Sequence, residues 1–378
     1  MKRFLIIVAL LLGCVSMQAQ ENSFWHKINR FLTKRAVVDT TRIYQPKASF
    51  SLGLFTTGQK ANFDVNVDFD VHLSDGNLLD GVSTYDLNEN LCQKIGLEVG
   101  YGNVALGYGI EIGTKSAKQK RAFAFNILGR SWGVRLNYYR ITNPFVSGLT
   151  VGNEGDNNYV HDEFISSEMA SLQSLAIDGY YVFNNKRFAY PAAYKMSLVQ
   201  RRTSGSWMLT ARYMQGYLYN SPDAALDSYN LLDCFGTVQA SIGGGYSVNF
   251  VLWHKDPVGP RDEKLRNITL NLTAMPILTA VNFLKTTSYR YDDEGNCVGE
   301  KNSSVWCYPV PNFIGSAAAS ITLGRFYFTT QFIYNRFYFR SRDAFDASQM
   351  DLPDYVEAIN FAGNFRDWTL KGLLVYRF

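Results

Sequence analysis

The chain has 378 residues and a formal net charge of +4, and 15% of its residues are aromatic. The small charge gives no reason to expect a nucleic-acid partner, and no basic run with interleaved aromatic residues suggests one. After the first residues, no apolar stretch approaches the roughly 20 residues that a membrane-spanning helix requires. These features exclude a helical membrane protein and leave two classes, a soluble β-protein and a membrane β-barrel.

The N-terminal residues predict a secretory signal peptide. Lys2 and Arg3 precede an apolar run over residues 4–12, and small and polar residues lead from there to Ala19. A positive start, a short apolar run and a small residue at the cleavage point characterise such peptides. We therefore expect residues 1–19 to be removed on export.

Residues 20–46 predict a periplasmic leader before the first strand. Phe24, Trp25, Ile28 and Phe31 follow helical spacing, with basic residues around them. This pattern is typical of a short amphipathic helix that lies on the membrane face or enters the mouth of a barrel. A frayed basic leader is the alternative.

The clearest strand covers residues 62–73, where apolar and polar residues alternate strictly. Alternation with a period of two indicates a strand, since successive side chains point to opposite faces. In a membrane barrel the apolar face contacts lipid and the polar face lines the interior. The apolar face would be Phe63, Val65, Val67, Phe69, Val71 and Leu73, and the polar face Asn62, Asp64, Asn66, Asp68, Asp70 and His72.

The same alternation recurs along the chain and predicts an all-β fold, a closed antiparallel transmembrane β-barrel over residues 47–378. A tight turn is expected at Gly102-Asn103, and Gly243-Gly244-Gly245 is expected to let a long strand bend. About fifteen candidate strands can be counted, and because bacterial barrels have even numbers we expect twelve or fourteen. The alternative, a soluble sandwich, would need a very large contiguous core. Further strands are expected over 95–101, 104–113, 238–252, 268–274 and 326–332, and a hairpin over 123–138.

Four polar segments are expected to be long extracellular loops: 74–90, 143–170, 276–310 and 341–356. Working back from a periplasmic Phe378, this assignment places a short turn at Arg366-Asp367 on the outer side. Short turns normally lie on the periplasmic side. Either the strand count fails locally, or the barrel carries long connections on its inner side.

Ten charged residues are expected to line the lumen because they alternate with apolar positions. Mixed signs fit a selective pore, and they fit equally a filled interior in which the charges satisfy one another. The residues are Asp64, Asp68, Asp70, Lys94, Glu98, Glu111, Arg135, Asp178, Arg212 and Lys371.

Catalytic and metal-binding patterns are weak. The sequence around His161-Asp162-Glu163 is nearest to a general-base or metal site, but its polar surroundings favour a solvated loop. The acidic run over residues 292–296 lacks the alternating donors and later glutamate of a calcium loop. We expect no enzyme activity, no metal site and no cofactor.

The cysteines allow two interpretations at the N-terminus. Cys14 is lost with the signal peptide, or it is lipidated, because Leu11-Leu12-Gly13-Cys14 resembles a lipoprotein box. In an oxidising compartment, Cys297 and Cys307 are the expected disulfide pair because both lie in one candidate loop. Cys92 and Cys234 are expected to be free buried thiols.

Three motifs carry a resemblance to a known family. They are Val38-Asp39-Thr40-Thr41 before the first strand, the run from Asn88 to Tyr101, and Gly244-Gly245-Tyr246-Ser247-Val248-Asn249-Phe250. With them, most of the mature chain resembles a Bacteroidota family of outer-membrane β-barrels that is classed as domain of unknown function 4421. The resemblance implies the fold and an outer-membrane location in a Gram-negative bacterium, and it supplies no catalytic residues.

Two functions fit these features. The first is a channel or transporter that moves a small solute, which the sequence does not identify. The second is a structural or interaction protein with a filled lumen. In both cases the expected partners are outer-membrane lipid and the barrel-assembly machinery, and the first function is favoured because unused interior charges are costly.

The C-terminus predicts an assembly signal. Leu370, Leu374, Tyr376 and the terminal Phe378 share one face, which is typical of the segment that the assembly machinery recognises. Deletion of Phe378 should leave export intact but lower outer-membrane abundance. A soluble fold would lose at most the burial energy of one phenylalanine, about 3 kcal/mol, without a change of compartment. Membrane-fraction abundance at matched low expression measures this, and unchanged abundance would contradict the signal.

Overall fold

The computed structural model describes residues 38–46, 50–72, 78–88, 92–112, 121–142, 145–154, 157–165, 170–195, 197–220, 234–257, 264–292, 297–342, 345–346 and 356–378. The signal peptide, the lipidation of Cys14 and the amphipathic part of the leader lie outside these residues, so they stay predictions. No helix in the described ranges is long and apolar enough to cross a membrane.

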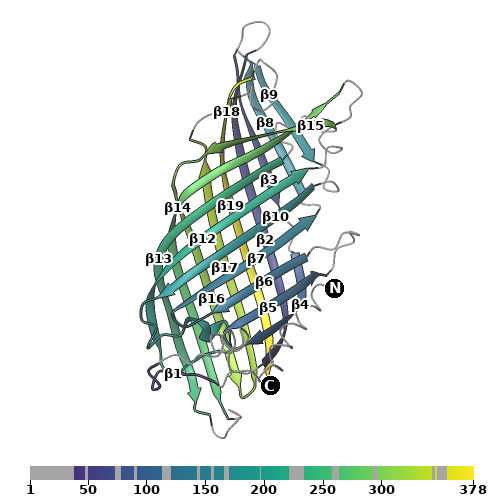
Figure 1. Ribbon diagram of the computed structural model, residues 1–378. Helices are drawn as coiled ribbons and strands as arrows, with labels where there is room; N and C mark the ends of the chain where they lie inside the picture. Colours follow the sequence, from purple (N-terminus) through teal and green to yellow (C-terminus); the bar gives the residue numbers. More distant parts are fainter. Residues whose placement is uncertain are drawn as a thin grey trace, which may run out of the picture.

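The fold is a closed antiparallel β-barrel with twelve strands in its wall, as the alternation predicts. Figure 1 shows an elongated barrel with tilted strands. We call the end that carries the C-terminus the C-terminal end, and the opposite end, which carries β8 and β9, the far end. The strands are β2 (Phe50–His72), β3 (Leu78–Asn88), β4 (Cys92–Tyr101), β5 (Val104–Glu111), β6 (Arg121–Leu128), β7 (Trp132–Thr142), β8 (Phe145–Glu154), β9 (Asn157–Ile165), β10 (Ala170–Val182), β12 (Ser204–Asn220), β13 (Cys234–Lys255), β14 (Arg266–Tyr291), β15 (Cys297–Trp306), β16 (Val310–Leu323), β17 (Phe326–Arg340), β18 (Phe345–Asp346) and β19 (Val356–Arg377).

Several of these strands lie end to end and share one position in the wall. β3 and β4 both pair with β2, and β15 and β16 both pair with β14. β5 and β6 are short, so beyond them β3 pairs directly with β8. Pairing of β7 with β10 and of β19 with β2 completes the cylinder.

Three of the four predicted long loops are wrong, because they contain long strands, and most of the fourth, 341–356, lies outside the described residues. β3 lies in 74–90, β8 and β9 lie in 143–170, and β14 continues through Pro276 to Tyr291. The predicted turn at Arg366-Asp367 is also wrong, since β19 runs through it without interruption. This removes the conflict over which side carries the short turns. These strand segments lie beyond the apolar outer surface, where a strand needs no lipid-facing residues. Their composition is therefore polar and resembles that of loops.

Pro276 is tolerated inside β14 because of a gap in the ladder. β13 pairs with β14 at Gly243 and again at Tyr246, but Gly244 and Gly245 have no partner on β14. A Cβ atom on Gly245 would lie only 2.0 Å from the carbonyl oxygen of Ala274. The missing N–H of proline therefore faces a position where no hydrogen bond is made, and glycine permits the close approach.

The outer surface of the barrel is apolar near the C-terminal end, and the interior there is polar. On β17, Phe326, Phe328 and Phe332 are exposed, whereas Thr329 and Gln331 between them are buried. The same inversion occurs on β14, where exposed Leu270 and Leu272 alternate with buried asparagine and threonine. A soluble sandwich has the opposite arrangement, so this band identifies the surface that lipid covers.

The two faces exchange character further along the same strands. Towards the far end of β17, the outward Arg336 and Arg340 are exposed, and the inward Phe337 and Phe339 are fully buried. The barrel therefore continues beyond its lipid-facing band as a β-structure with water outside and a hydrophobic core inside. The length of its strands agrees, because about 9–11 residues suffice to cross a membrane and β17 has 15.

This exchange corrects the predicted direction of residues 62–73. Val65 is 3% exposed and points inward, on the same face as Phe55, which lines the interior. Asp64 and Asp68 lie on the outer face, and Asp64 forms an ion pair with Arg366. The alternation correctly predicts a strand. This part of β2 lies beyond the lipid-facing band, so water rather than lipid covers its outer face.

Aromatic side chains mark the edge of the band at the C-terminal end. Phe378 contacts Phe50 and Tyr376 with ring centroids 5.6 and 5.0 Å apart, and Tyr376 contacts Phe326 at 5.1 Å. Trp207 and Tyr246 form a further exposed pair nearby. Aromatic girdles of this kind lie at the membrane interface.

The exchange of faces predicts different costs for two matched substitutions on the outer face of β17. Phe328→Arg should destabilise the folded barrel by about 2–4 kcal/mol, since arginine would stand in the lipid-facing band. Tyr338→Arg lies between Arg336 and Arg340 and should cost less than about 1 kcal/mol. Urea unfolding in lipid vesicles measures both, and equal costs would contradict the proposed limit of the band.

An inward plug and a polar chamber as the candidate functional site

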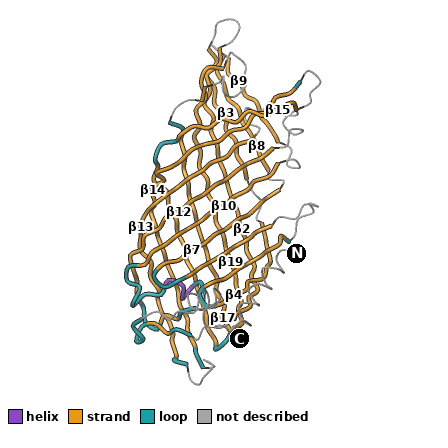
Figure 2. The backbone as a smooth tube through the Cα atoms, in the orientation of Figure 1, coloured by secondary structure: helices purple, strands orange, loops and turns teal. Residues whose placement is uncertain are grey.

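A segment between two wall strands folds into the barrel at the C-terminal end. Residues 183–203 connect β10 to β12 and contain a 3-10 helix, η2 (Tyr190–Ala193), and the short strand β11 (Val199–Gln200). β11 pairs with β1 (Ile43–Tyr44), which precedes the first wall strand. Figure 2 shows the helix within the outline of the wall near this end. We call residues 38–46 and 183–203 the plug.

The plug is held by apolar packing. Tyr190, Ala193 and Tyr194 pack with Leu128, Met208 and other wall residues in one buried cluster. Val199 and Tyr44 pack against a second cluster on the opposite side of the barrel mouth. These contacts place packed plug side chains across the C-terminal end of the barrel.

Polar wall residues add specific hydrogen bonds to the plug. They come from asparagine, threonine and glutamine side chains that face inward because the band inverts the usual pattern. The hydrogen bonds run from Asn249 Nδ2 to the Ala189 carbonyl (2.8 Å), from Asn267 Nδ2 to the Gln200 carbonyl (2.8 Å), from Thr329 Oγ1 to the Ala193 carbonyl (2.8 Å), from Gln331 Nε2 to the Tyr194 carbonyl (3.1 Å) and from the Tyr194 hydroxyl to Asn271 Oδ1 (2.8 Å).

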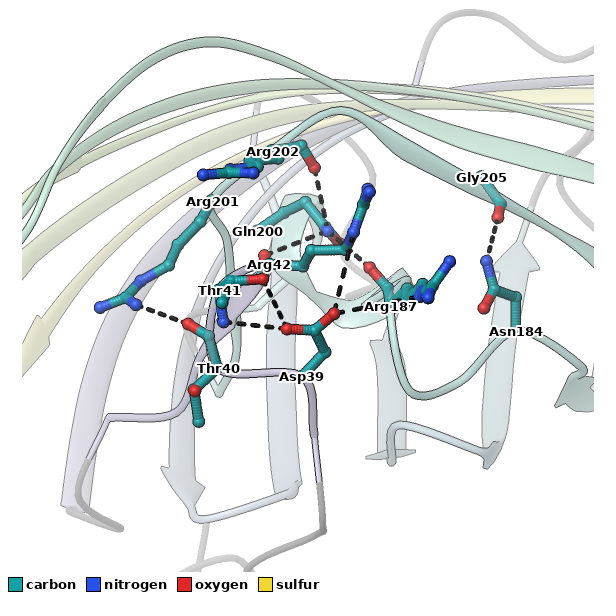
Figure 3. A network of polar contacts seen from close by, with 10 residues as sticks. All are labelled: Asp39, Thr40, Thr41, Arg42, Asn184, Arg187, Gln200, Arg201, Arg202 and Gly205. Carbon is teal, nitrogen blue, oxygen red and sulfur yellow. Dashed lines mark hydrogen bonds and ion pairs between the residues drawn. The ribbon is translucent and has the colours of Figure 1, made fainter.

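Gln200 joins the two parts of the plug. Its Nε2 donates to the carbonyl oxygens of Arg42, Arg187 and Arg202 at 3.2, 2.8 and 3.0 Å. Its Oε1 accepts from the Ala189 N–H at 2.8 Å. The side chain is fully buried, so water cannot replace these partners. Figure 3 shows Gln200 between the two backbone segments.

The Val38-Asp39-Thr40-Thr41 motif forms the other contact between the two parts. Asp39 accepts hydrogen bonds from the Thr41 N–H and hydroxyl, at 3.0 and 2.6 Å (Figure 3). The same carboxylate lies 3.9 Å from Arg42 and from Arg187 of the 183–203 segment. The Thr41 hydrogen bonds, helped by the two arginines, hold the pKa of Asp39 below its usual value. The motif thus has a structural role in closing this end.

Beyond the plug lies an internal cavity of about 200 Å³, here called the chamber. The position of the chamber along the barrel axis follows from β19, where Asp367, Thr369 and Lys371 line the chamber. The buried Phe361 and Phe365 come next along the same strand, towards the far end. The interior therefore has three levels: the plug, the chamber and an apolar layer.

The apolar layer consists of Phe235, Phe337, Phe339, Phe361 and Phe365, which we call the phenylalanine layer. Ring centroids lie 5.8 Å apart for Phe235 and Phe339, and 6.5 Å apart for Phe337 and Phe365. All five side chains are buried. Side-chain packing thus fills the interior on the far side of the chamber.

Arg212 organises one side of the chamber. Its Nε lies 3.0 Å from the Asp178 carboxylate, and its Nη1 donates to Asn335 Oδ1 at 2.7 Å. Asn335 in turn donates to Asp367 at 2.5 Å, and the guanidinium stacks over the Phe337 ring at 4.7 Å. Strands distant in sequence are tied together by this network.

A second ion pair lies across the chamber. Lys371 contacts Glu98 at 2.8 Å and lies 4.9 Å from the centre of the Phe55 ring. Lys94 donates to Gln59 at 3.1 Å. These groups are largely buried, so pairing is what makes their charge tolerable.

Lys195, at the end of the η2 turn, is the plug's own charged contribution to the chamber. The residue is 9% exposed, and its ammonium has no hydrogen-bond partner in the described part of the chain. Burial lowers the pKa of Lys195 to about 8, although the Glu98 carboxylate acts in the opposite direction.

The structure brings six of the ten predicted lumen residues to the chamber: Lys94, Glu98, Arg135, Asp178, Arg212 and Lys371. Asp64 and Asp68 lie outside, and the side chains of Asp70 and Glu111 are outside the described part. Lys195 and Asp367 were missed. Lys195 lies in a segment whose sequence has no periodicity. Asp367 lies in the predicted turn, although it shares one strand face with Lys371, and this spacing could have indicated that it lines the lumen.

The predicted Cys297–Cys307 disulfide is wrong, since both are free thiols. They lie at opposite ends of β15, with Cys307 directly after its last residue. An extended strand rises about 3.3 Å per residue, whereas a disulfide needs Cα atoms within about 7 Å. Cys234 is buried and is a thiol outside any disulfide, as expected.

The closed barrel, the apolar outer band and the polar interior define the class: an outer-membrane-type β-barrel. Within that class, the chain belongs to the family described as domain of unknown function (DUF4421), whose model matches residues 37–352. The matched region begins just before the Asp39 motif and includes the whole plug.

Three solved barrels are similar in outline. The outer-membrane protease OmpT of Escherichia coli is 9% identical, with 87% of this chain and 97% of that chain covered and a TM-score of 0.32. The β domain of the Bordetella autotransporter BrkA is 9% identical, with 85% and 100% covered and a TM-score of 0.22. A Pseudomonas aeruginosa FadL homologue is 8% identical, with 87% and 90% covered and a TM-score of 0.21. These values are too low to carry an inference on function. A comparison with curated proteins gave no match.

Gln200→Leu should release the plug. The Arg187 and Arg202 carbonyl groups and the Ala189 N–H would lose their buried partner, at about 1–3 kcal/mol for each unsatisfied group that cannot reach water, whereas the Arg42 carbonyl keeps its hydrogen bond from the Arg201 N–H. Asn184→Ala removes an exposed hydrogen bond to the Gly205 carbonyl on the same segment and is the control. Limited proteolysis of the folded protein should cut residues 183–203 faster in Gln200→Leu only. Equal resistance of both variants would contradict the joining role of Gln200.

Proposed function

We propose that the protein is an outer-membrane β-barrel of a Gram-negative bacterium that holds a small solute in a closed internal chamber and is not an open diffusion pore. The plugged end faces the periplasm, and passage of the solute requires displacement of the plug and opening of the phenylalanine layer. The observation that carries this proposal is a polar chamber between two levels of packed side chains.

The location is supported by the outer surface. A band of exposed leucine, phenylalanine and tryptophan side chains surrounds the barrel at the level of the plug and chamber. Water would make such a band costly, whereas lipid covers it. The short turns at Gly102 and Gly324, both with positive φ, lie at the C-terminal end, as periplasmic turns do.

A binding role, in preference to free passage, is supported by the filling of the interior. The plug buries its tyrosines against the wall, and the phenylalanine layer is buried on the far side. An open pore would leave a continuous water-filled path between them. The chamber charges nevertheless suit a polar solute, because an inert filling would be cheaper with apolar residues.

A structural or interaction role is the second candidate. The strand extension beyond the band favours it, because β2 and β19 continue there with a polar outer face that could present a partner with a rigid surface. In that case the chamber charges serve only to hold the strands together. The two candidates differ in whether the chamber binds a ligand.

Planar-bilayer recordings test the closed state. The wild-type protein should show no steady conductance. A variant with residues 184–205 replaced by a short Gly-Asn turn, and a second variant with Phe337→Ala and Phe361→Ala, should also stay closed, because each keeps one barrier. The combined variant should conduct.

Heat-modifiable migration on gels is the control for folding, since each phenylalanine truncation costs about 3–5 kcal/mol. Steady conductance of the wild-type protein would overturn the proposed closed barrel.

A further inference from the structure

The chamber carries more positive than negative charge. Its described lining contains five cationic and three carboxylate side chains. Buried charges are stable only when they are paired or hydrogen-bonded, so the pairing decides which cations remain available. The cations are Lys94, Arg135, Lys195, Arg212 and Lys371, and the carboxylates are Glu98, Asp178 and Asp367.

All three carboxylates already have partners. Glu98 contacts Lys371 at 2.8 Å, and Asp178 contacts Arg212 at 3.0 Å. Asp367 accepts a hydrogen bond from Asn335, which itself accepts one from Arg212. Each described carboxylate of the chamber therefore has a nearer partner than Lys195 or Arg135.

Lys195 and Arg135 are the cations without such a partner. The Lys195 ammonium and the Arg135 Nε are buried and make no hydrogen bond to a described residue. Both side chains line the same chamber. Glu98 and Asp178 act on these two cations electrostatically but accept no hydrogen bond from the Lys195 ammonium or the Arg135 Nε. Buried cationic N–H groups without an acceptor are costly, so two of them at one cavity indicate that an anion can be accommodated there.

The position of Lys195 is fixed by the plug. Its N–H donates to the Pro191 carbonyl at 2.7 Å, and the hydroxyl of the neighbouring Tyr194 is hydrogen-bonded to Asn271 and Ser316 of two wall strands. The stem of Lys195 lies over Gly100 of β4, where a Cβ atom would be 3.7 Å from its Cε. The ammonium is therefore positioned before any ligand arrives.

We propose that the chamber is a binding site for a small organic anion, whose carboxylate accepts hydrogen bonds from Lys195 and Arg135. This inference rests on the proposed function and names the class of solute. Phe55, Phe337 and Ile314 line the same cavity and suit a short apolar body. The volume of about 200 Å³ lies below the roughly 300–1,000 Å³ of pockets for drug-sized ligands, so the anion is small.

The experiment compares three probes of similar size and different charge: benzoate, benzamide and benzylammonium. The full mature chain is refolded in detergent with each probe, so that a closed chamber can take it up, and affinity is measured by calorimetric displacement and by the melting temperature. Benzoate should bind at least about tenfold more tightly than benzamide, and benzylammonium should not bind, because charge-assisted hydrogen bonds give the difference. Equal affinity for benzoate and benzamide would overturn the anion site.

Variants separate this site from general effects of charge. Lys195→Met should weaken benzoate at least about tenfold and raise the melting temperature of the ligand-free protein, because it removes an unpaired buried charge. Lys195→Arg should retain benzoate binding. Arg336→Met, which removes an exposed cation of the outer face, should leave benzoate affinity within about twofold. Weakening by Arg336→Met equal to that by Lys195→Met would refute the site.

The outcome is independent of the conductance recordings. If Lys195→Met does not refold, the three probes on the wild-type protein still decide the proposal. If the wild-type protein does not conduct and binds benzoate no more tightly than benzamide, the anion site alone is refuted. Steady conductance with the charge preference intact refutes the closed barrel alone.

Discussion

The structure depends on closure of one hydrogen-bonded ladder. Because β2 pairs with β19 and β7 with β10, the twelve-stranded wall closes without a free edge, and only strands of the far extension such as β9 and β15 have a single described neighbour. Backbone pairing is then complete without help from solvent, which is the condition for a β-structure in lipid. Side chains on the two faces are left free to match whatever medium each face meets.

The medium changes along the strands, and the side chains change with it. Near the C-terminal end, lipid-facing Phe328 stands opposite a polar interior that holds the plug and the chamber. Past the level of Asn335, water replaces lipid outside and Phe337 and Phe339 fill the interior. One strand therefore contains a membrane segment and a soluble-type segment, and the point of exchange defines the far wall of the chamber.

The sequence predicted the barrel, its antiparallel closure and six of the residues at the chamber, because alternation reports which residues share a face. It did not predict which face is inside, since residues 62–73 alternate as clearly as any lipid-facing strand and yet turn Val65 inward. It also could not predict Lys195, because the 183–203 segment has no period and gains its position only from contacts with distant strands such as Asn249 and Thr329. The lipoprotein alternative at Cys14 and the leader before residue 38 lie outside the described residues.

The central claim is that the interior is closed and that the outer face passes from lipid to water along one strand. A spin-label scan of β17 tests it most directly, using single cysteines from 326 to 340 in a background with the native cysteines replaced by serine, reconstituted in lipid vesicles. Labels at even positions up to 332 should be relaxed by oxygen, those at 336–340 by a water-soluble nickel complex, and those at odd positions by neither. Relaxation of the odd positions by the nickel complex would show a water-filled lumen and contradict the account.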